Sequence, residues 1–166
     1  MTDKNPIADK RINIRLELGN GFERKEFMDL MYLECEKNII LEYGYDLETA
    51  QKKAREIIAA NFNNRKEPEE VCFLVAIDIE TSLEVGGVFI LFYPEYNSAL
   101  GDTMIVYPRF RGYGIARQIM NQAEDYMRSV GVKNVGIGVM YDNEIAVNLY
   151  KRKKYEPIIL HFEKWL

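Results

Sequence analysis

The alternation of apolar and polar positions predicts an opening strand followed by two helices. Over residues 12–18, isoleucine and leucine alternate with charged or polar residues, which is the period-two pattern of a half-buried strand, and Gly19-Asn20-Gly21 ends it. Apolar residues then recur at helical spacing over residues 22–43 and again from residue 47 onward. Asp46 directly precedes the second of these helices and is expected to cap its N-terminus.

A polar, proline-containing loop over residues 62–70 separates these helices from a second group of elements. Residues 71–79 and 84–93 are rich in branched and aromatic residues and are expected to pair as an antiparallel hairpin. The remaining expected elements are a strand over 99–107, a helix over 112–130, a strand over 135–140, a helix over 143–153 and a closing strand over 155–165.

This order, β-α-α-β-β-β-α-β-α-β, predicts an α+β fold in which helices flank one mixed central sheet. The chain has 166 residues and 48% hydrophobic content, enough for one sizeable core, so residues 1–166 are expected to form a single domain. The formal net charge of −4 comes from charges of mixed sign, which argues against nucleic acid as a partner.

The sequence gives no sign of export, membrane insertion or a metal site. It has no signal-like apolar run near residue 1 and no stretch of the ~20 apolar residues that span a bilayer, so a cytoplasmic location is expected. Cys35 and Cys72 are far apart and are interpreted as core thiols. His161 is the only histidine, so a histidine-rich metal site and a Ser-His-Asp triad are both disfavoured, and no metal is expected.

Candidate chemistry begins where the strand over 99–107 leads into the helix over 112–130. Gly112 and Gly114 lie in the turn between them, and a helix start with glycines lets a phosphate group approach unpaired backbone N–H groups. Arg109 and Arg111 add positive charge beside the same turn. The turn lacks the Gly-Lys-Ser/Thr of a Walker loop and the third glycine of a dinucleotide-binding fingerprint. An ordinary glycine turn with two solvated arginines is the alternative.

The run Arg109-x-x-Gly112-x-Gly114-Ile115-Ala116 resembles the acyl-CoA-binding motif, Arg/Gln-x-x-Gly-x-Gly/Ala, of the GNAT family of N-acetyltransferases. The resemblance implies a GNAT-like, mostly antiparallel sheet and acetyl-CoA as the acyl donor. It also implies that the turn binds the CoA pyrophosphate and that the preceding strand pairs with pantetheine. The cofactor-binding residues implied here are Ile105, Val106, Arg109, Phe110, Arg111, Gly112, Tyr113, Gly114, Ile115 and Ala116.

A second stretch, from Asn143 to Tyr155, resembles the same family's Asn-x-x-Ala-x-x-Leu-Tyr-x-x-x-Gly-Phe signature. The resemblance implies that Asn143 contacts the CoA arm and that Tyr150 protonates the leaving thiolate. Tyr155 stands in place of the usual Phe, and Lys154 replaces the glycine that normally ends the helix. Two questions stay open: whether Tyr150 only packs in the core, and whether the basic run 151–154 is a solvated helix face or binds the adenosine 3′-phosphate.

Amine acetylation also requires a group that accepts the proton of the attacking amine. Asp102 is the first candidate, because its even spacing from Met104 and Val106 would place all three on one face of the strand if no bulge intervenes. An exposed or turn carboxylate is the alternative reading of Asp102. Glu84 and Glu36 are weaker candidates.

The resemblance further implies an acceptor pocket between the first two helices and the hairpin. The residues there most suited to shape it are Tyr32, Glu36, Tyr93 and Tyr96. The expected function is acetyl transfer to a primary amine through a ternary complex, by a monomer or homodimer, and the acceptor is a small molecule or a peptide or protein amine. Two alternatives remain: a catalytically inactive acyl-CoA sensor and a protein-interaction module.

Overall fold

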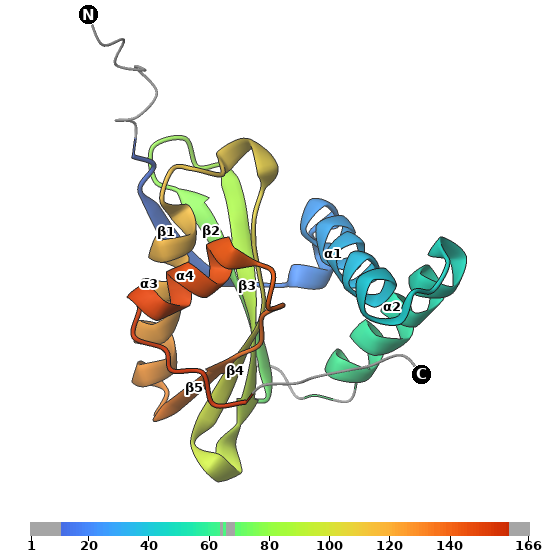
Figure 1. Ribbon diagram of the computed structural model, residues 1–166. Coiled ribbons are helices and arrows are strands. Elements are labelled where there is room, and N and C mark those ends of the chain that lie inside the picture. Colours follow the sequence, from blue (N-terminus) through green and yellow to red (C-terminus); the bar gives the residue numbers. More distant parts are fainter. Residues whose placement is uncertain (1–10, 64, 66–68, 160–166) are drawn as a thin grey trace, which may run out of the picture.

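The computed structural model describes residues 11–63, 65 and 69–159, and those residues contain a five-stranded sheet in the order β1-β2-β3-β4-β5 (Figure 1). The elements are β1 (Ile14–Gly19), η1 (Gly21–Glu23), α1 (Lys25–Tyr43), α2 (Leu47–Phe62), β2 (Val71–Asp78), β3 (Glu84–Tyr93), η2 (Pro94–Tyr96), β4 (Ser98–Val106), η3 (Pro108–Phe110), α3 (Ile115–Ser129), β5 (Asn134–Ile137) and α4 (Glu144–Arg152).

Strands β1 to β4 pair antiparallel in sequence order, and β5 then pairs parallel to β4. The expected α+β fold with a mixed, mostly antiparallel sheet is confirmed. The predicted hairpin is also confirmed, since β2 and β3 pair from Val71↔Leu91 to Ile77↔Glu84. The β4–β5 pairing is short and ends at Gly101↔Ile137, which leaves the second half of β4 without this neighbour.

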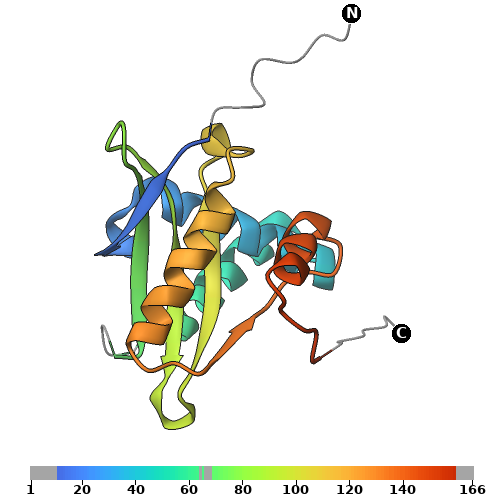
Figure 2. The same ribbon diagram turned by 90° about the vertical axis from the view of Figure 1, so that its left-hand side faces the viewer.

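Helices cover both faces of the sheet, with α1 and α2 on one side and α3 on the other (Figures 1 and 2). Alternate residues of the central strands supply the two cores. Leu74 and Ile90 pack with α3, whereas Phe73 and Phe89 pack with α1 and α2. Because both faces of β2 and β3 are buried, these strands read as continuous apolar runs in the sequence.

Two glutamines of α3 hold β1 in place. The Gln118 side chain accepts from the Ile14 amide (3.1 Å) and donates to the Ile12 carbonyl (2.6 Å). Gln122 accepts from the Leu16 amide (2.9 Å) and donates to the Ile14 carbonyl (2.9 Å). These bonds satisfy backbone groups of an edge strand, and they fix the position of α3, whose N-terminus borders the functional site.

The cap of α2 and the burial of the two cysteines can be set beside what the sequence predicts for them. Asp46 caps α2 as expected, accepting from the Thr49 amide at 2.9 Å. Cys72 is buried, as expected of a core thiol, while Cys35 is half-buried. Within the described residues, no helix combines the length and apolar character needed to span a bilayer. Those same residues form no group of three His, Cys, Asp or Glu that could hold a metal ion, and His161 lies outside them.

The closing strand predicted over 155–165 is not found where the structure describes it. Residues 155–159 form no strand, and residues 160–166 lie outside the described part of the chain. Pro157 has no N–H to donate to a ladder, and Ile158 and Ile159 are exposed. The apolar residues that suggested a strand therefore have no sheet partner over this range.

Candidate active site

A cleft of about 1600 Å³ lies between α1 and α2 on one side and the start of α3 and α4 on the other, with β4 between them. Of the residues expected to form the site, most line this cleft. They are Asp102, Ile105, Val106, Phe110, Arg111, Gly112, Gly114, Ile115, Ala116, Asn143 and Tyr150. The two motifs, which the chain separates by a helix and a strand, thus border one space.

The glycine turn leaves open space beside its backbone. Gly112 and Gly114 have φ of +86° and +75°, and a Cβ added to either would meet nothing within 4 Å. Gly114 is the N-cap of α3 and has no side chain with which to cap the first turn. Because Gly114, Ile115 and Ala116 all line the cleft, the unpaired N–H groups and the positive end of α3 border it. This geometry fits a phosphate group, as the sequence predicts.

The arginines near the turn have different partners. Arg111 lines the cleft and donates from Nε to the Val106 carbonyl at 3.1 Å. Arg109 does not line the cleft; it pairs with Glu26 of α1, and its guanidinium lies 4.8 Å from the Phe110 ring centroid. Arg117, which the sequence analysis missed, lines the cleft from the first turn of α3. Its position directly after Ala116, the last residue of the motif, was the available signal.

Asp102 lies in a β-bulge, which corrects the expected placement of its side chain. The register of β4 on β3 passes from Ile90↔Gly101 to Phe89↔Thr103, so Asp102 is the extra residue. Met104 packs in the core on the α3 side, but Asp102 follows Leu100, which packs on the α1–α2 side. A bulge reverses the alternation of side chains, so Asp102 and Met104 do not share a face.

The bulge places the Asp102 side chain on the side of β4 that faces α1 and α2. Thr103 donates to it at 2.9 Å. Burial raises the pKa of Asp102 above its ordinary value, and the Thr103 hydroxyl and the charge of Arg65 offset part of that effect. A raised pKa makes a carboxylate a better proton acceptor at neutral pH. Of the two weaker base candidates, Glu84 is paired with Arg24 (3.0 Å), and neither Glu84 nor Glu36 lines the cleft.

Helix α4 brings Tyr150 to the cleft, and Tyr150 also lines a small cavity beside it together with Asp102 and Met104. Burial raises the pKa of Tyr150, so its hydroxyl is protonated at neutral pH and is available as a hydrogen-bond donor. Asn143 lines the cleft and accepts from the Ala146 amide at 3.2 Å, which caps α4. Asn143 therefore has a structural role whether or not it contacts a ligand.

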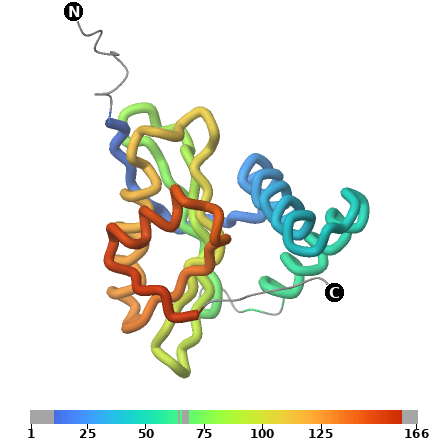
Figure 3. The backbone as a smooth tube through the Cα atoms, in the orientation of Figure 1, coloured from blue at the N-terminus to red at the C-terminus, as the bar shows by residue number. Residues whose placement is uncertain are grey.

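The end of α4 keeps the left-handed geometry of a glycine despite its lysine. Lys154 has φ of +65°, and its N–H donates to the Lys151 carbonyl (3.0 Å) while the Tyr155 N–H donates to the Tyr150 carbonyl (3.0 Å). This is the bonding pattern of a Schellman cap. Lys153, directly after α4, pairs with Glu124 of α3 at 2.8 Å, and Figure 3 shows α4 and the residues that follow it in red. Of the basic run 151–154, Arg152 and Lys153 line the cleft.

The four residues expected to bind the acceptor do not line the cleft. Tyr32 packs against buried residues of α1 and α2. The Arg65 guanidinium carbon lies 5.3 Å from the Tyr93 ring centroid, and Tyr96 is 74% exposed. Glu36 lies on the same face of α1 as Tyr32, four residues away. Their role stays a prediction. The helical wall of the cleft is instead formed by Leu30, Met31, Glu34, Cys35, Lys37, Asn38 and Leu41 of α1 and by Ile57, Ile58, Asn61 and Phe62 of α2.

A sheet in which β4 extends past its parallel neighbour beside a glycine turn and a helix start is the framework of an acyl-CoA-dependent acyltransferase. The model of the acetyltransferase (GNAT) family matches residues 31–155, and the chain belongs to this family. It is an acyl-CoA-dependent acetyltransferase.

Solved structures share the fold at low sequence identity. YycN from Bacillus subtilis, assigned as an acetyltransferase, has a TM-score of 0.81 at 19% identity, over 93% of this chain and 99% of YycN. The PaiA N-acetyltransferase of Thermoplasma acidophilum, solved with coenzyme A, has a TM-score of 0.59 at 16% identity, over 86% and 89% of the two chains. An aminoglycoside acetyltransferase from an uncultured soil metagenomic sample, solved with sisomicin, has a TM-score of 0.55 at 15% identity, over 92% and 96%.

Proposed function

We propose that this enzyme transfers an acetyl group from acetyl-CoA to the primary amine of a small molecule, with both substrates bound at once. The observation that carries the proposal is the single cleft of about 1600 Å³ that joins the phosphate-binding turn to the helical wall. A pocket for one drug-sized ligand is typically about 300–1000 Å³. The larger cleft therefore suits a cosubstrate and an acceptor side by side.

The donor half of the cleft is the side formed by the glycine turn, β4 and α4. Gly112 and Gly114 let the pyrophosphate reach the N–H groups at the start of α3, where the helix dipole favours negative charge. Arg111 and Arg117 add positive charge at the same end. Acetyl-CoA bound there supplies an activated thioester, whose acyl carbon an amine attacks as the bond to sulfur breaks.

Two side chains of this protein handle the protons of that exchange. Asp102 accepts the proton that the amine nitrogen loses, either directly or through water. Tyr150 donates its hydroxyl proton to the departing thiolate, so the products are the acetylated amine and CoA thiol. Both residues line the cleft, Asp102 from β4 and Tyr150 from α4, and both also line the small cavity beside it.

The acceptor half is the wall built by α1 and α2. Glu34, Lys37, Asn38 and Asn61 are the polar residues of an otherwise largely apolar wall, and Lys37 pairs with Glu34 at 3.2 Å. Because Lys37 offsets the charge of Glu34, the Asp102 carboxylate is the group that favours a cationic amine over an anionic acceptor. The likeness to an aminoglycoside acetyltransferase supports a small-molecule amine.

The test is amine-dependent release of CoA thiol from acetyl-CoA, measured with a panel of polyamines, amino acids and aminoglycosides. We expect at least one cationic amine to accelerate release, with initial-rate lines that intersect when both substrates are varied. Parallel lines would indicate a covalent acyl-enzyme and contradict the ternary complex. Absence of acceleration by the whole panel, with acetyl-CoA shown to bind, would contradict a small-molecule acceptor.

A further inference from the structure

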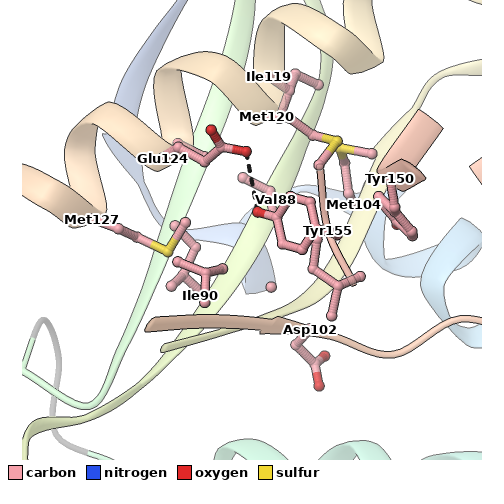
Figure 4. A pocket seen from close by; sticks show the side chains of 14 residues that line it. Val88, Ile90, Asp102, Met104, Ile119, Met120, Glu124, Met127, Tyr150 and Tyr155 are labelled. Atoms are coloured by element: carbon pink, nitrogen blue, oxygen red, sulfur yellow. Dashed lines mark hydrogen bonds between the residues drawn. The ribbon is translucent and has the colours of Figure 1, made fainter. Parts of the chain in front are cut away.

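A small apolar cavity lies between the sheet and α3, next to the cleft (Figure 4). Its volume is about 50 Å³. Nine apolar residues and Gly101 form most of its wall, and the polar contributors are Asp102, Glu124 and two tyrosines. The apolar side chains are Val88, Ile90, Met104, Ile119, Met120, Ala123, Met127, Val135 and Ile137, with Tyr150 and Tyr155 beside them.

The polar groups at this cavity leave its interior apolar. The Tyr155 hydroxyl donates to Glu124 at 3.1 Å, the dashed line in Figure 4, and Glu124 also pairs with Lys153 at 2.8 Å. The Asp102 carboxylate points away from the apolar side chains in the same view. Cavities with apolar walls stay dry and accept small apolar groups in place of water.

The cavity adjoins the reacting part of the cleft. Asp102, Met104 and Tyr150 border both spaces. The junction lies where the β4–β5 pairing ends at Gly101↔Ile137, and beyond that point no described strand continues the pairing between the two spaces. An acyl group bound with its thioester sulfur near Tyr150 would lie beside this cavity, because Tyr150 lines both spaces.

We propose that this cavity is an acyl-chain pocket and that it makes propionyl-CoA a better ligand than acetyl-CoA. The inference rests on the proposed function, because it needs the thioester to lie near Tyr150. A cavity of 150 Å³ that binds benzene provides roughly 25 Å³ for each carbon. By the same measure, about 50 Å³ holds two carbons, which are the methylene and methyl groups beyond a propionyl carbonyl. The third such carbon of a butyryl group exceeds that room.

The size of the effect follows from the apolar surface buried. Each added methylene contributes about 0.8 kcal/mol when it is buried, which corresponds to roughly a fourfold gain in affinity. We therefore expect propionyl-CoA to bind roughly fourfold tighter than acetyl-CoA. Butyryl-CoA is expected to bind no tighter than propionyl-CoA, because close-packed walls do not accommodate extra volume without strain.

The experiment is calorimetric titration of the full chain with CoA, acetyl-CoA, propionyl-CoA and butyryl-CoA. Tightest binding of propionyl-CoA supports the pocket. Binding of CoA and acetyl-CoA with weaker binding of propionyl-CoA overturns the pocket but leaves the proposed function standing. If CoA itself does not bind, the proposed function fails, and the pocket fails with it.

Two variants with opposite effects sharpen the result. Ala123→Val adds two carbons to the cavity wall and is expected to bring the affinities of propionyl-CoA and acetyl-CoA together. Ile137→Ala removes wall volume at a half-buried strand position and is expected to shift the optimum to butyryl-CoA. Ala60→Val, at an exposed site on α2, is the matched control for the change of helix propensity and should keep the propionyl preference. If all three variants keep the wild-type order of affinities, the cavity does not receive the acyl chain.

Discussion

A side chain at Gly112 tests whether the pyrophosphate must approach the backbone of this turn closely. Because nothing lies within 4 Å of the added Cβ, Gly112→Leu meets no protein atom there, and the open space is the space that the pyrophosphate is proposed to fill. The positive φ of +86° alone costs about 1–2 kcal/mol of stability in a non-glycine residue. The variant should therefore fold, with a moderate loss of stability.

The effect on CoA affinity should be much larger than the effect on the fold. A hydrogen bond to a charged group contributes about 1.5–3 kcal/mol. Blocking two backbone N–H bonds to the pyrophosphate would then cost at least about 3 kcal/mol, which is a loss of affinity of roughly 100-fold or more.

Gly131→Leu is the matched control, because Gly131 has φ of +92° and also has nothing within 4 Å of an added Cβ, but it does not line the cleft. The assay is calorimetric titration with CoA, together with urea unfolding of both variants. We expect similar stability losses in the two variants and loss of CoA binding in Gly112→Leu alone. Wild-type CoA affinity in Gly112→Leu would refute the assignment of the turn.

Three further substitutions address the proton transfers and the cap of α4. Tyr150→Phe should lower the turnover number by about 100-fold or more with the Kd for acetyl-CoA unchanged; an unchanged turnover number in steady-state kinetics would leave Tyr150 with packing alone. Since burial raises the pKa of Asp102, kcat/KM should fall as pH decreases through that raised pKa, and Asp102→Asn should have low activity and lack this acidic limb in a pH–rate profile. The raised pKa also means that the folded state favours the protonated carboxyl, so the stability that Asp102 contributes is present at low pH and is lost as pH rises. Asp102→Asn should therefore be more stable than wild type at neutral pH in urea unfolding. The difference in the free energy of unfolding should shrink in acid. Lys154→Gly removes the strain of a lysine at φ of +65° and should raise the free energy of unfolding by about 0.5–1 kcal/mol. A thermal melt measures this gain, and an unchanged melting temperature would mean that the cap is unimportant for stability.

The parts of the structure that the sequence predicts well are those set by local chemistry. The alternation and branched residues of 84–93 predict β3 with the same bounds, and the amphipathic pattern of 112–130 predicts α3 within three residues at its start. Gly112 and Gly114 occupy positive-φ positions in the turn, as the motif requires.

The parts that the sequence does not predict depend on contacts between elements. The bulge at Asp102 arises from how β4 pairs with β3. The even spacing of Asp102, Met104 and Val106 in the sequence does not predict it. Helix α1 has buried residues such as Phe27 and Ile39 and also exposed apolar residues such as Leu33, so its pattern does not reveal which face borders the cleft. Tyr32 is selected by residue type alone, and it does not lie on the face of α1 that lines the cleft.

The central claim is that the cleft between α1, β4 and α4 binds the acyl donor. Calorimetric titration of the folded, ligand-free protein with acetyl-CoA tests this most directly. We expect acetyl-CoA to bind at one site per chain with a micromolar Kd. The heat of acetyl-CoA binding should disappear when a large excess of CoA already occupies the site. Absence of any binding heat across several temperatures, in protein shown to be folded, would contradict the account.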